Sequence, residues 1–207
     1  MTRGQKIIAF IENFVRIPEG SKVGEPMKLM KFQKRFILDV YDNPNGTSRA
    51  YLSVARKNGK SALIAGLVLA HLVGPEAKQN SQIVSGARSR DQASLVFKLA
   101  EKMVRLSPEL NKIVRVVPSQ KQLIGLICNV EYKAISADSS TAHGMSPILA
   151  IIDEAGQVRG PTDAFIEAVE TAQGAHEAPL LIAISTQAAT DGDMFSMWLD
   201  AAENAKD

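Results

Sequence analysis

The residues best suited to chemistry lie in one short segment, Val54 to Ser61, which reads Val-Ala-Arg-Lys-Asn-Gly-Lys-Ser. It follows a short apolar stretch and precedes a strongly helical one, residues 62–72. A strand that turns through Gly-Lys-Ser into a helix is typical of a phosphate-binding loop, because backbone N–H groups at the helix N-terminus converge on phosphate oxygens. The usual first glycine of such a loop is replaced by Val54, so the loop alone leaves open an ordinary exposed helix start.

A second group, Asp153 and Glu154, follows a run of five apolar residues, 148–152. Such a run predicts a strand buried on both faces, and open α/β sheets bind ligands at the carboxyl ends of their strands. Adjacent carboxylates point in different directions. We therefore expect Asp153 to hold Mg²⁺ and Glu154 to orient and deprotonate a water, the alternative being an ordinary acidic turn.

A third apolar run, residues 180–184, ends in the uncharged hydrogen-bonding side chains of Ser185, Thr186 and Gln187. A polar end on a neighbouring strand can sense whether a γ-phosphate is present. Three strands that end in Gly-Lys-Ser, Asp-Glu and Ser-Thr-Gln together predict a nucleoside triphosphatase.

The remaining sequence supplies the elements that position these groups. The apolar patterns predict helices at about residues 4–16, 30–41, 60–72, 90–106, 163–172 and 194–204. They predict strands at residues 50–54, 81–85, 148–152 and 180–184, and three short antiparallel strands at 113–117, 122–127 and 130–136. We expect an α/β fold with an open, mainly parallel central sheet flanked by helices, and a small antiparallel edge or lid subregion.

Composition is that of one soluble globular domain spanning residues 1–207, with 45% hydrophobic and 22% charged residues. The longest apolar run is about eleven residues, too short to span a bilayer. The start of the chain does not resemble a signal peptide. The single cysteine, Cys128, excludes an intrachain disulfide, so we expect a reduced cytoplasmic protein without a membrane segment.

Charge is small in total, +2, but unevenly distributed. Residues 1–60 carry 12 Lys/Arg against 5 Asp/Glu, whereas residues 153–207 carry 2 against 11. This asymmetry favours head-to-tail contact between copies or a surface that faces DNA on one side, and uneven but solvated faces stay possible.

These motifs, in this order, resemble the ATPase half of the large terminase subunits, the motors that package DNA into procapsids of tailed bacteriophages. That family tolerates loss of the first loop glycine and often has an arginine within the loop, as Arg56 is here. Its corresponding strands end in Asp-Glu and in Ser/Thr, matching Asp153-Glu154 and Ser185-Thr186. The sequence of residues 55–61 and 153–158 as a whole resembles the branch of the family found in lambdoid-type long-tailed phages.

The resemblance implies a P-loop NTPase of the additional-strand catalytic-Glu type, with ATP and Mg²⁺ as cofactors. It implies that Gln33 contacts adenine and that Thr186 reports hydrolysis. The implied catalytic residues are Glu154, Arg56 and Lys60, and the implied metal-binding residues are Ser61 and Asp153. The implied nucleotide-binding residues are Gln33, Ala55, Arg56, Lys57, Asn58, Gly59, Lys60, Ser61 and Thr186.

The implied partners are double-stranded DNA, the portal protein, the small terminase subunit and further copies in a ring on the portal, in the host cytoplasm. The C-terminal nuclease domain of the full-length family member is not expected within residues 1–207. Many members also have an Arg-Gly pair before the Asp-Glu strand, which supplies a candidate trans-acting arginine. Here the matching place reads Ala142-His143-Gly144, and Arg88, Arg90 and Arg105 are possible substitutes.

Two other functions compete with this hypothesis. The first is a stand-alone P-loop ATPase or helicase-like enzyme, although a helicase needs a second recombinase-like domain that 207 residues do not accommodate. The second is a nucleotide-binding assembly module without turnover, in which the variant loop binds nucleotide but does not support hydrolysis.

Overall fold

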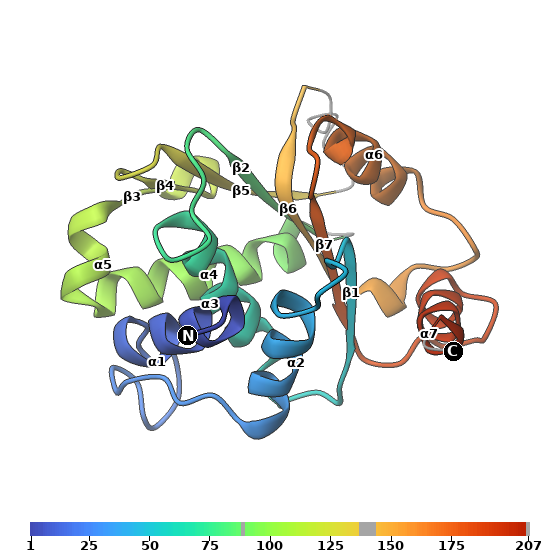
Figure 1. Cartoon of the computed structure of the whole chain (residues 1–207), viewed down its shortest axis with the longest axis horizontal. Helices are drawn as coiled ribbons and strands as arrows, with labels where there is room; N and C mark the ends of the chain where they lie inside the picture. The colour runs from blue at the N-terminus through green and yellow to red at the C-terminus, as the bar shows by residue number, and fades with distance from the viewer. Residues whose placement is uncertain (88–89, 137–143, 206–207) are drawn as a thin grey trace.

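A single seven-stranded sheet forms the centre of the protein, in a computed structural model that describes residues 1–87, 90–136 and 144–205 (Figure 1). Its strand order is β1-β7-β6-β2-β5-β4-β3. The strands are β1 (Arg49–Ser53), β2 (Gln82–Ala87), β3 (Val114–Val117), β4 (Gln122–Gly125), β5 (Val130–Ser136), β6 (Pro147–Asp153) and β7 (Leu180–Ser185). All neighbours from β1 to β5 are parallel, and β4 and β3 continue the sheet antiparallel. The predicted α/β class and the antiparallel edge are confirmed.

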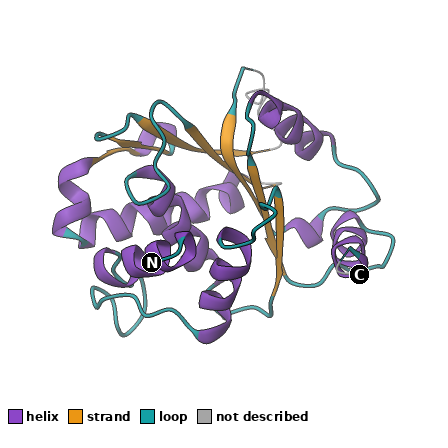
Figure 2. Ribbon diagram, viewed as in Figure 1, coloured by secondary structure: helices purple, strands orange, loops and turns teal. Residues whose placement is uncertain are grey.

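Helices cover both faces of this sheet (Figure 2). They are α1 (Arg3–Phe14), α2 (Lys31–Tyr41), α3 (Lys60–Leu72), α4 (Arg90–Leu106), α5 (Pro108–Ile113), α6 (Ala164–Ala172) and α7 (Met194–Asn204). The first five pack in one hydrophobic core, and α6 and α7 pack in a second core on the other face. Strand β6 contributes alternately to both, with Leu149 and Ile151 in the first and Ala150 and Ile152 in the second. This two-sided burial explains why the sequence of β6 is continuously apolar.

The strand between β1 and β6 is β7, which comes last along the chain. The resemblance implied an extra strand at this place, and β7 fills it. Because β1, β6 and β7 are parallel, their carboxyl ends lie at the same edge of the sheet. The three polar motifs predicted from the sequence are therefore brought to one edge.

Two details differ from the sequence-based prediction. Strand β5 is antiparallel to β4 but also pairs in parallel with β2, with Gln82 opposite Glu131, so it belongs to the main sheet as well as to the edge. Helix α5 was not predicted, because six residues are too few for a periodic pattern. Its local signals are Ser107, whose hydroxyl accepts from the Leu110 N–H, and Pro108 in the first turn.

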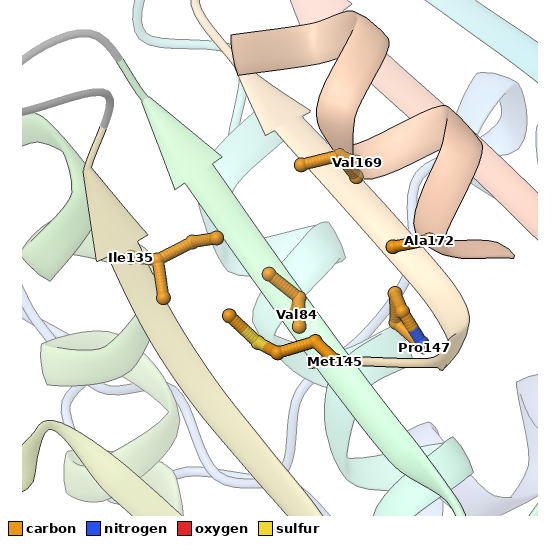
Figure 3. A pocket seen from close by; sticks show the side chains of 6 residues that line it. All are labelled: Val84, Ile135, Met145, Pro147, Val169 and Ala172. Atoms are coloured by element: carbon orange, nitrogen blue, oxygen red, sulfur yellow. The ribbon is translucent and has the colours of Figure 1, made fainter. Parts of the chain in front are cut away.

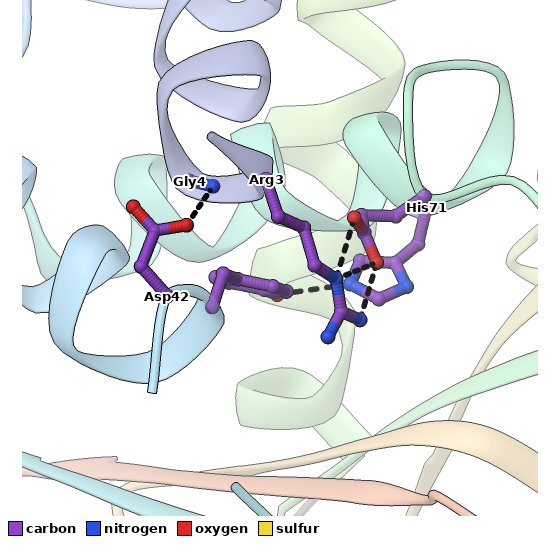
Figure 4. Close-up of polar contacts among 6 residues, drawn as sticks. Arg3, Gly4, Asp42 and His71 are labelled. Carbon is purple, nitrogen blue, oxygen red and sulfur yellow. Dashed lines mark hydrogen bonds and ion pairs between the residues drawn. The ribbon is translucent and has the colours of Figure 1, made fainter. Parts of the chain in front are cut away.

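A polar cluster fastens the first helix to the ends of α2 and α3 (Figure 4). The Arg3 guanidinium pairs with Glu76 at 2.6 Å and lies 5.2 Å from the centre of the Tyr41 ring. The Tyr41 hydroxyl is 2.9 Å from Nε2 of the buried His71. Burial, together with the positive charges of Arg3 and Lys78, lowers the pKa of His71 to about 3, so this histidine is neutral at physiological pH. Within the described residues, no helix has the length and apolarity needed to cross a membrane.

Candidate active site

The phosphate-loop segment links β1 to α3 through two residues in the left-handed conformation, Lys57 (φ 66°) and Gly59 (φ 72°). A side chain at Gly59 would be strained, and its Cβ would lie 3.3 Å from Nε2 of Gln33. Val54 is not among the described residues with positive φ, and its N–H donates to the carbonyl of Ser185 at 3.1 Å. The first position of the loop therefore continues the β1–β7 pairing, a conformation that does not require glycine.

Lys60 is the first residue of α3, and its side chain crosses back over the loop. The residue is only 7% exposed, and Nζ donates to the carbonyl of Val54 at 2.9 Å. Arg56 and Lys57 are exposed on the same loop, and the Asn58 side chain donates to the carbonyl of Ala55 at 3.2 Å. The loop thus gathers three cationic side chains at a helix N-terminus, which is the electrostatic setting of an anion site.

The carboxylate pair lies at the end of β6. Asp153 is 4% exposed, and its Oδ1 is buried without a hydrogen-bond partner among the described residues. Burial, reinforced by the neighbouring Glu154 charge, raises the pKa of Asp153 to about 6. Glu154 adopts a left-handed conformation, φ 55° and ψ 40°, and its Oε2 is also buried and unpaired within the described residues. Buried unpaired carboxylate oxygens are unfavourable, so their position indicates a place for a cation or a water.

The loop and Glu154 border one hollow of about 360 Å³, within the size range of ligand sites. Its polar wall consists of Arg56, Lys57, Gly59, Lys60, Ser61 and Glu154. Its remaining lining residues are Ile17, Pro18, Glu19, Ala62, Leu95 and Leu99. These mostly apolar side chains were not predicted, since a leucine or proline in a pocket has the same sequence signature as one in a core. Asp153 lines a smaller hollow of about 10 Å³ that also includes Glu154.

A different hollow, between β2, β5, β6 and α6, is shown in Figure 3. It is lined by the apolar side chains of Val84, Ile135, Met145, Pro147, Val169 and Ala172 and measures about 10 Å³. It is too small for a nucleotide and offers no charge to bind one, so it is a packing defect of the second core.

Neither Gln33 nor Thr186 is among the residues that line the hollow. Gln33 is 2% exposed, its Oε1 accepts from the Met30 N–H at 2.9 Å, and its Nε2 faces Gly59. Thr186 is half-buried. The preceding Ser185 makes the contacts at this end of β7, because its hydroxyl accepts from the Gly156 N–H at 2.9 Å. Ser185, which the sequence suggested only as part of the Ser-Thr motif, therefore contacts the turn that follows Glu154.

Of the three possible substitutes for a trans-acting arginine, Arg105 is the one whose side chain the structure describes. Arg88 and His143 lie outside the described residues, and the side chain of Arg90 is not described. Arg105 is in the last turn of α4 and pairs with Glu101 at 2.7 Å, with its side chain 57% exposed. The structure does not bring Arg105 into the hollow lined by Lys60 and Glu154.

A parallel sheet with a phosphate loop after one strand and an Asp-Glu pair after another defines the chain as a P-loop-type nucleoside triphosphatase. Residues 31–203 match the family described as terminase large subunit, ATPase domain. The chain is 67% identical over 207 residues to the large subunit of terminase from Enterobacteria phage HK97, a lambdoid phage, and spans 41% of that protein. The chain belongs to the family of terminase large subunit ATPase domains.

Two solved structures agree with this assignment. The crystal structure of the HK97 bacteriophage large terminase matches the whole chain with a TM-score of 0.95 and 66% identity, the chain covering 42% of it. The ATPase domain of the large terminase from Thermus phage P74-26 is 22% identical, with a TM-score of 0.60 over 79% of this chain and 66% of that one. This second likeness concerns the fold alone.

Proposed function

We propose that this domain binds ATP with Mg²⁺ and hydrolyses it to drive double-stranded DNA into a procapsid. The observation that carries the proposal is the convergence of Lys60, Ser61 and Glu154 on one hollow, with Asp153 adjoining Glu154. Cations at a helix N-terminus suit a polyphosphate, and carboxylates beside them suit its metal ion and its attacking water.

Lys60 would bind the β- and γ-phosphates by exchanging its bond to the Val54 carbonyl for a charge-assisted bond to a phosphate oxygen. Arg56 would add a second cation, while the backbone of residues 55–59 surrounds the phosphates. Ser61 and Asp153 would hold Mg²⁺, which supplies charge neutralisation when bound; the unpaired Oδ1 of Asp153 fits this role. Gln33 would contact the adenine.

Glu154 would perform the proton transfer. A water oxygen bonds to the γ-phosphorus as the bond from that phosphorus to the β–γ bridging oxygen breaks, and the carboxylate accepts the water proton. The products are ADP and inorganic phosphate. Thr186, next to Ser185 at the end of β7, would pass the loss of the γ-phosphate to the parts of the motor that contact DNA.

The assembly we propose is a homo-oligomeric ring on the portal protein in the host cytoplasm, with the small terminase subunit as a further partner. The support is the family membership and the opposite charge of residues 1–60 and 153–207. The chain spans about two fifths of the HK97 protein, and we place the nuclease activity of a full-length terminase outside residues 1–207.

The test compares nucleotide binding with phosphate release in two variants. Lys60→Ala should abolish nucleotide binding, whereas Glu154→Gln should bind nucleotide and release phosphate roughly 10²-fold more slowly. The controls are Lys6→Ala and Glu177→Gln, which change exposed residues outside the hollow.

The alternatives give different results. Wild-type protein that binds ATP without ever releasing phosphate, even with DNA and portal present, would indicate an assembly module. If Lys60→Ala still hydrolyses ATP at the wild-type rate, residues 54–61 are not the phosphate-binding loop.

A further inference from the structure

Hydrogen bonds hold the segment that follows Glu154 in place. One comes from Gln92 to the Gln157 side chain at 2.9 Å, and two others join backbone N–H groups of the segment to side chains near the two ends of the β7–α7 loop. A left-handed conformation in a non-glycine residue such as Glu154 is unfavourable and persists only where its surroundings impose it. The first backbone attachment is the bond from the Gly156 N–H to Ser185, in a short 3-10 turn, Ala155–Gln157. The second attachment lies four residues further on, at Gly160.

Asp193 makes this second attachment. Its Oδ1 accepts from the Gly160 N–H at 3.0 Å, and its Oδ2 accepts from Arg159 at 3.2 Å and from the Thr190 N–H at 3.0 Å. The Met194 N–H also donates to the Gly160 carbonyl at 2.8 Å. Asp193 is 4% exposed, so these bonds are largely shielded from water. The donors lower the pKa of Asp193 and keep it ionised.

The position of Asp193 gives an independent argument. It is the N-cap residue of α7, where an aspartate normally accepts from the first N–H groups of its own helix. Asp163, the N-cap of α6, does so, accepting from Phe165 and Ile166. Asp193 makes no such bond to α7. Its carboxylate is turned instead toward the segment that follows Glu154.

We propose that Asp193 is a positioning residue that holds Glu154 in its working orientation by fixing the far end of the 156–160 segment. This inference rests on the proposed function of Glu154 as the catalytic carboxylate. Because Ser185 and Asp193 flank the loop between β7 and α7, the orientation of Glu154 is coupled to the start of α7. A shift of α7 would move the carboxylate relative to the bound nucleotide.

Two substitutions separate positioning from helix capping. Asp193→Ser places a favoured N-cap residue before α7 but is too short to reach Gly160, whereas Asp193→Asn keeps one oxygen acceptor for Gly160 and loses the acceptor for Arg159 and Thr190. We expect Asp193→Ser to lower kcat about 10-fold with KM for ATP within about 2-fold, and Asp193→Asn to recover part of the loss. Amide hydrogen exchange at residues 156–160 should accelerate in Asp193→Ser only.

The control is Asp42→Ala. Asp42 likewise holds a backbone N–H of another segment, that of Gly4 at 2.7 Å (Figure 4), and it does not line the hollow. This variant should melt at a lower temperature with unchanged kcat. Wild-type kcat and wild-type exchange in Asp193→Ser would overturn the proposal. If Glu154→Gln instead keeps full turnover, the proposed function fails, while the exchange data still report whether Asp193 holds the segment.

Discussion

The hydroxyl of Ser185 accepts a hydrogen bond from the backbone N–H of Gly156 at 2.9 Å. The carbonyl of the same serine accepts from the Val54 N–H at 3.1 Å. Ser185 therefore joins the beginning of the phosphate loop to the turn that follows Glu154, and it is completely buried while doing so. A structural change in the phosphate loop is therefore passed to the turn after Glu154, or from that turn to the loop, through Ser185.

Gly156 leaves no space for a side chain at this connection. A Cβ there would lie 2.7 Å from both the Ser185 hydroxyl and the Thr186 carbonyl, so Gly156→Ala requires the backbone to move. We expect an overpacking cost of about 1–3 kcal/mol in unfolding free energy and a larger fractional loss of ATP turnover than of nucleotide affinity. Thermal melting measures the change in stability, and phosphate release measures the change in ATP turnover. Gly174→Ala, at a position with open space, should change neither.

Asp153 gives a pH dependence of stability with a definite sign. Its folded pKa of about 6 is above the ordinary 3.8, so the folded protein binds more protons than the unfolded chain between these values. The contribution of Asp153 to stability therefore falls as pH rises from 4 to 6, by roughly 3 kcal/mol at most. Without Mg²⁺, Asp153→Asn should be more stable than wild type at pH 7 and equal to it below pH 4. Denaturant unfolding at several pH values checks this, and an equal gain at every pH would contradict it.

His71 makes stability depend on pH in the opposite direction. Its folded pKa of about 3 is below the ordinary 6.5, so the unfolded chain binds more protons between these values. Its stabilising contribution is complete above pH 6.5 and is lost at about 1.4 kcal/mol per unit as pH falls. His71→Gln should remove this slope. Between pH 4 and 6, the contributions of Asp153 and His71 to stability change in opposite directions and partly cancel in the wild-type protein. Each single variant therefore shows the pH dependence that the other residue contributes.

Assembly should control the hydrolysis rate. An arginine supplied by a neighbouring molecule contributes about 10³- to 10⁵-fold in phosphoryl-transfer sites. We expect the isolated domain to hydrolyse ATP slowly and its specific activity to rise with protein concentration. Because residues 1–60 and 153–207 have opposite net charge, added salt should weaken that rise. A high specific activity that is constant on dilution would show that every catalytic group belongs to the same chain.

Much of the fold was predictable because the decisive patterns are local. The continuous apolar runs of β6 and β7 predict buried strands, and the Gly-Lys-Ser turn marks the start of α3 within one residue. The pairing partners of β5 were not predictable, since an apolar run does not say whether its neighbour is β2, β4 or both. Register and neighbours are set by packing between distant segments.

The site was predictable to the extent that its chemistry has characteristic residues. Lys60, Ser61 and Glu154 were found from their types and spacing, and they do line one hollow. The contacts of Asp193 were not foreseen, because an aspartate before a helix predicts an ordinary cap. Its bond to Gly160 depends on where two loops from different strands meet. The adenine contact of Gln33 and the reporting role of Thr186 stay predictions.

The place of β7 has a consequence for synthesis on the ribosome. This strand separates β1 from β6 in the sheet, yet it follows both of them along the chain. A nascent chain that has already emerged through Glu154 still lacks the strand that joins β1 to β6. Vectorial folding therefore leaves the centre of the sheet open until β7, made later, inserts between these two strands.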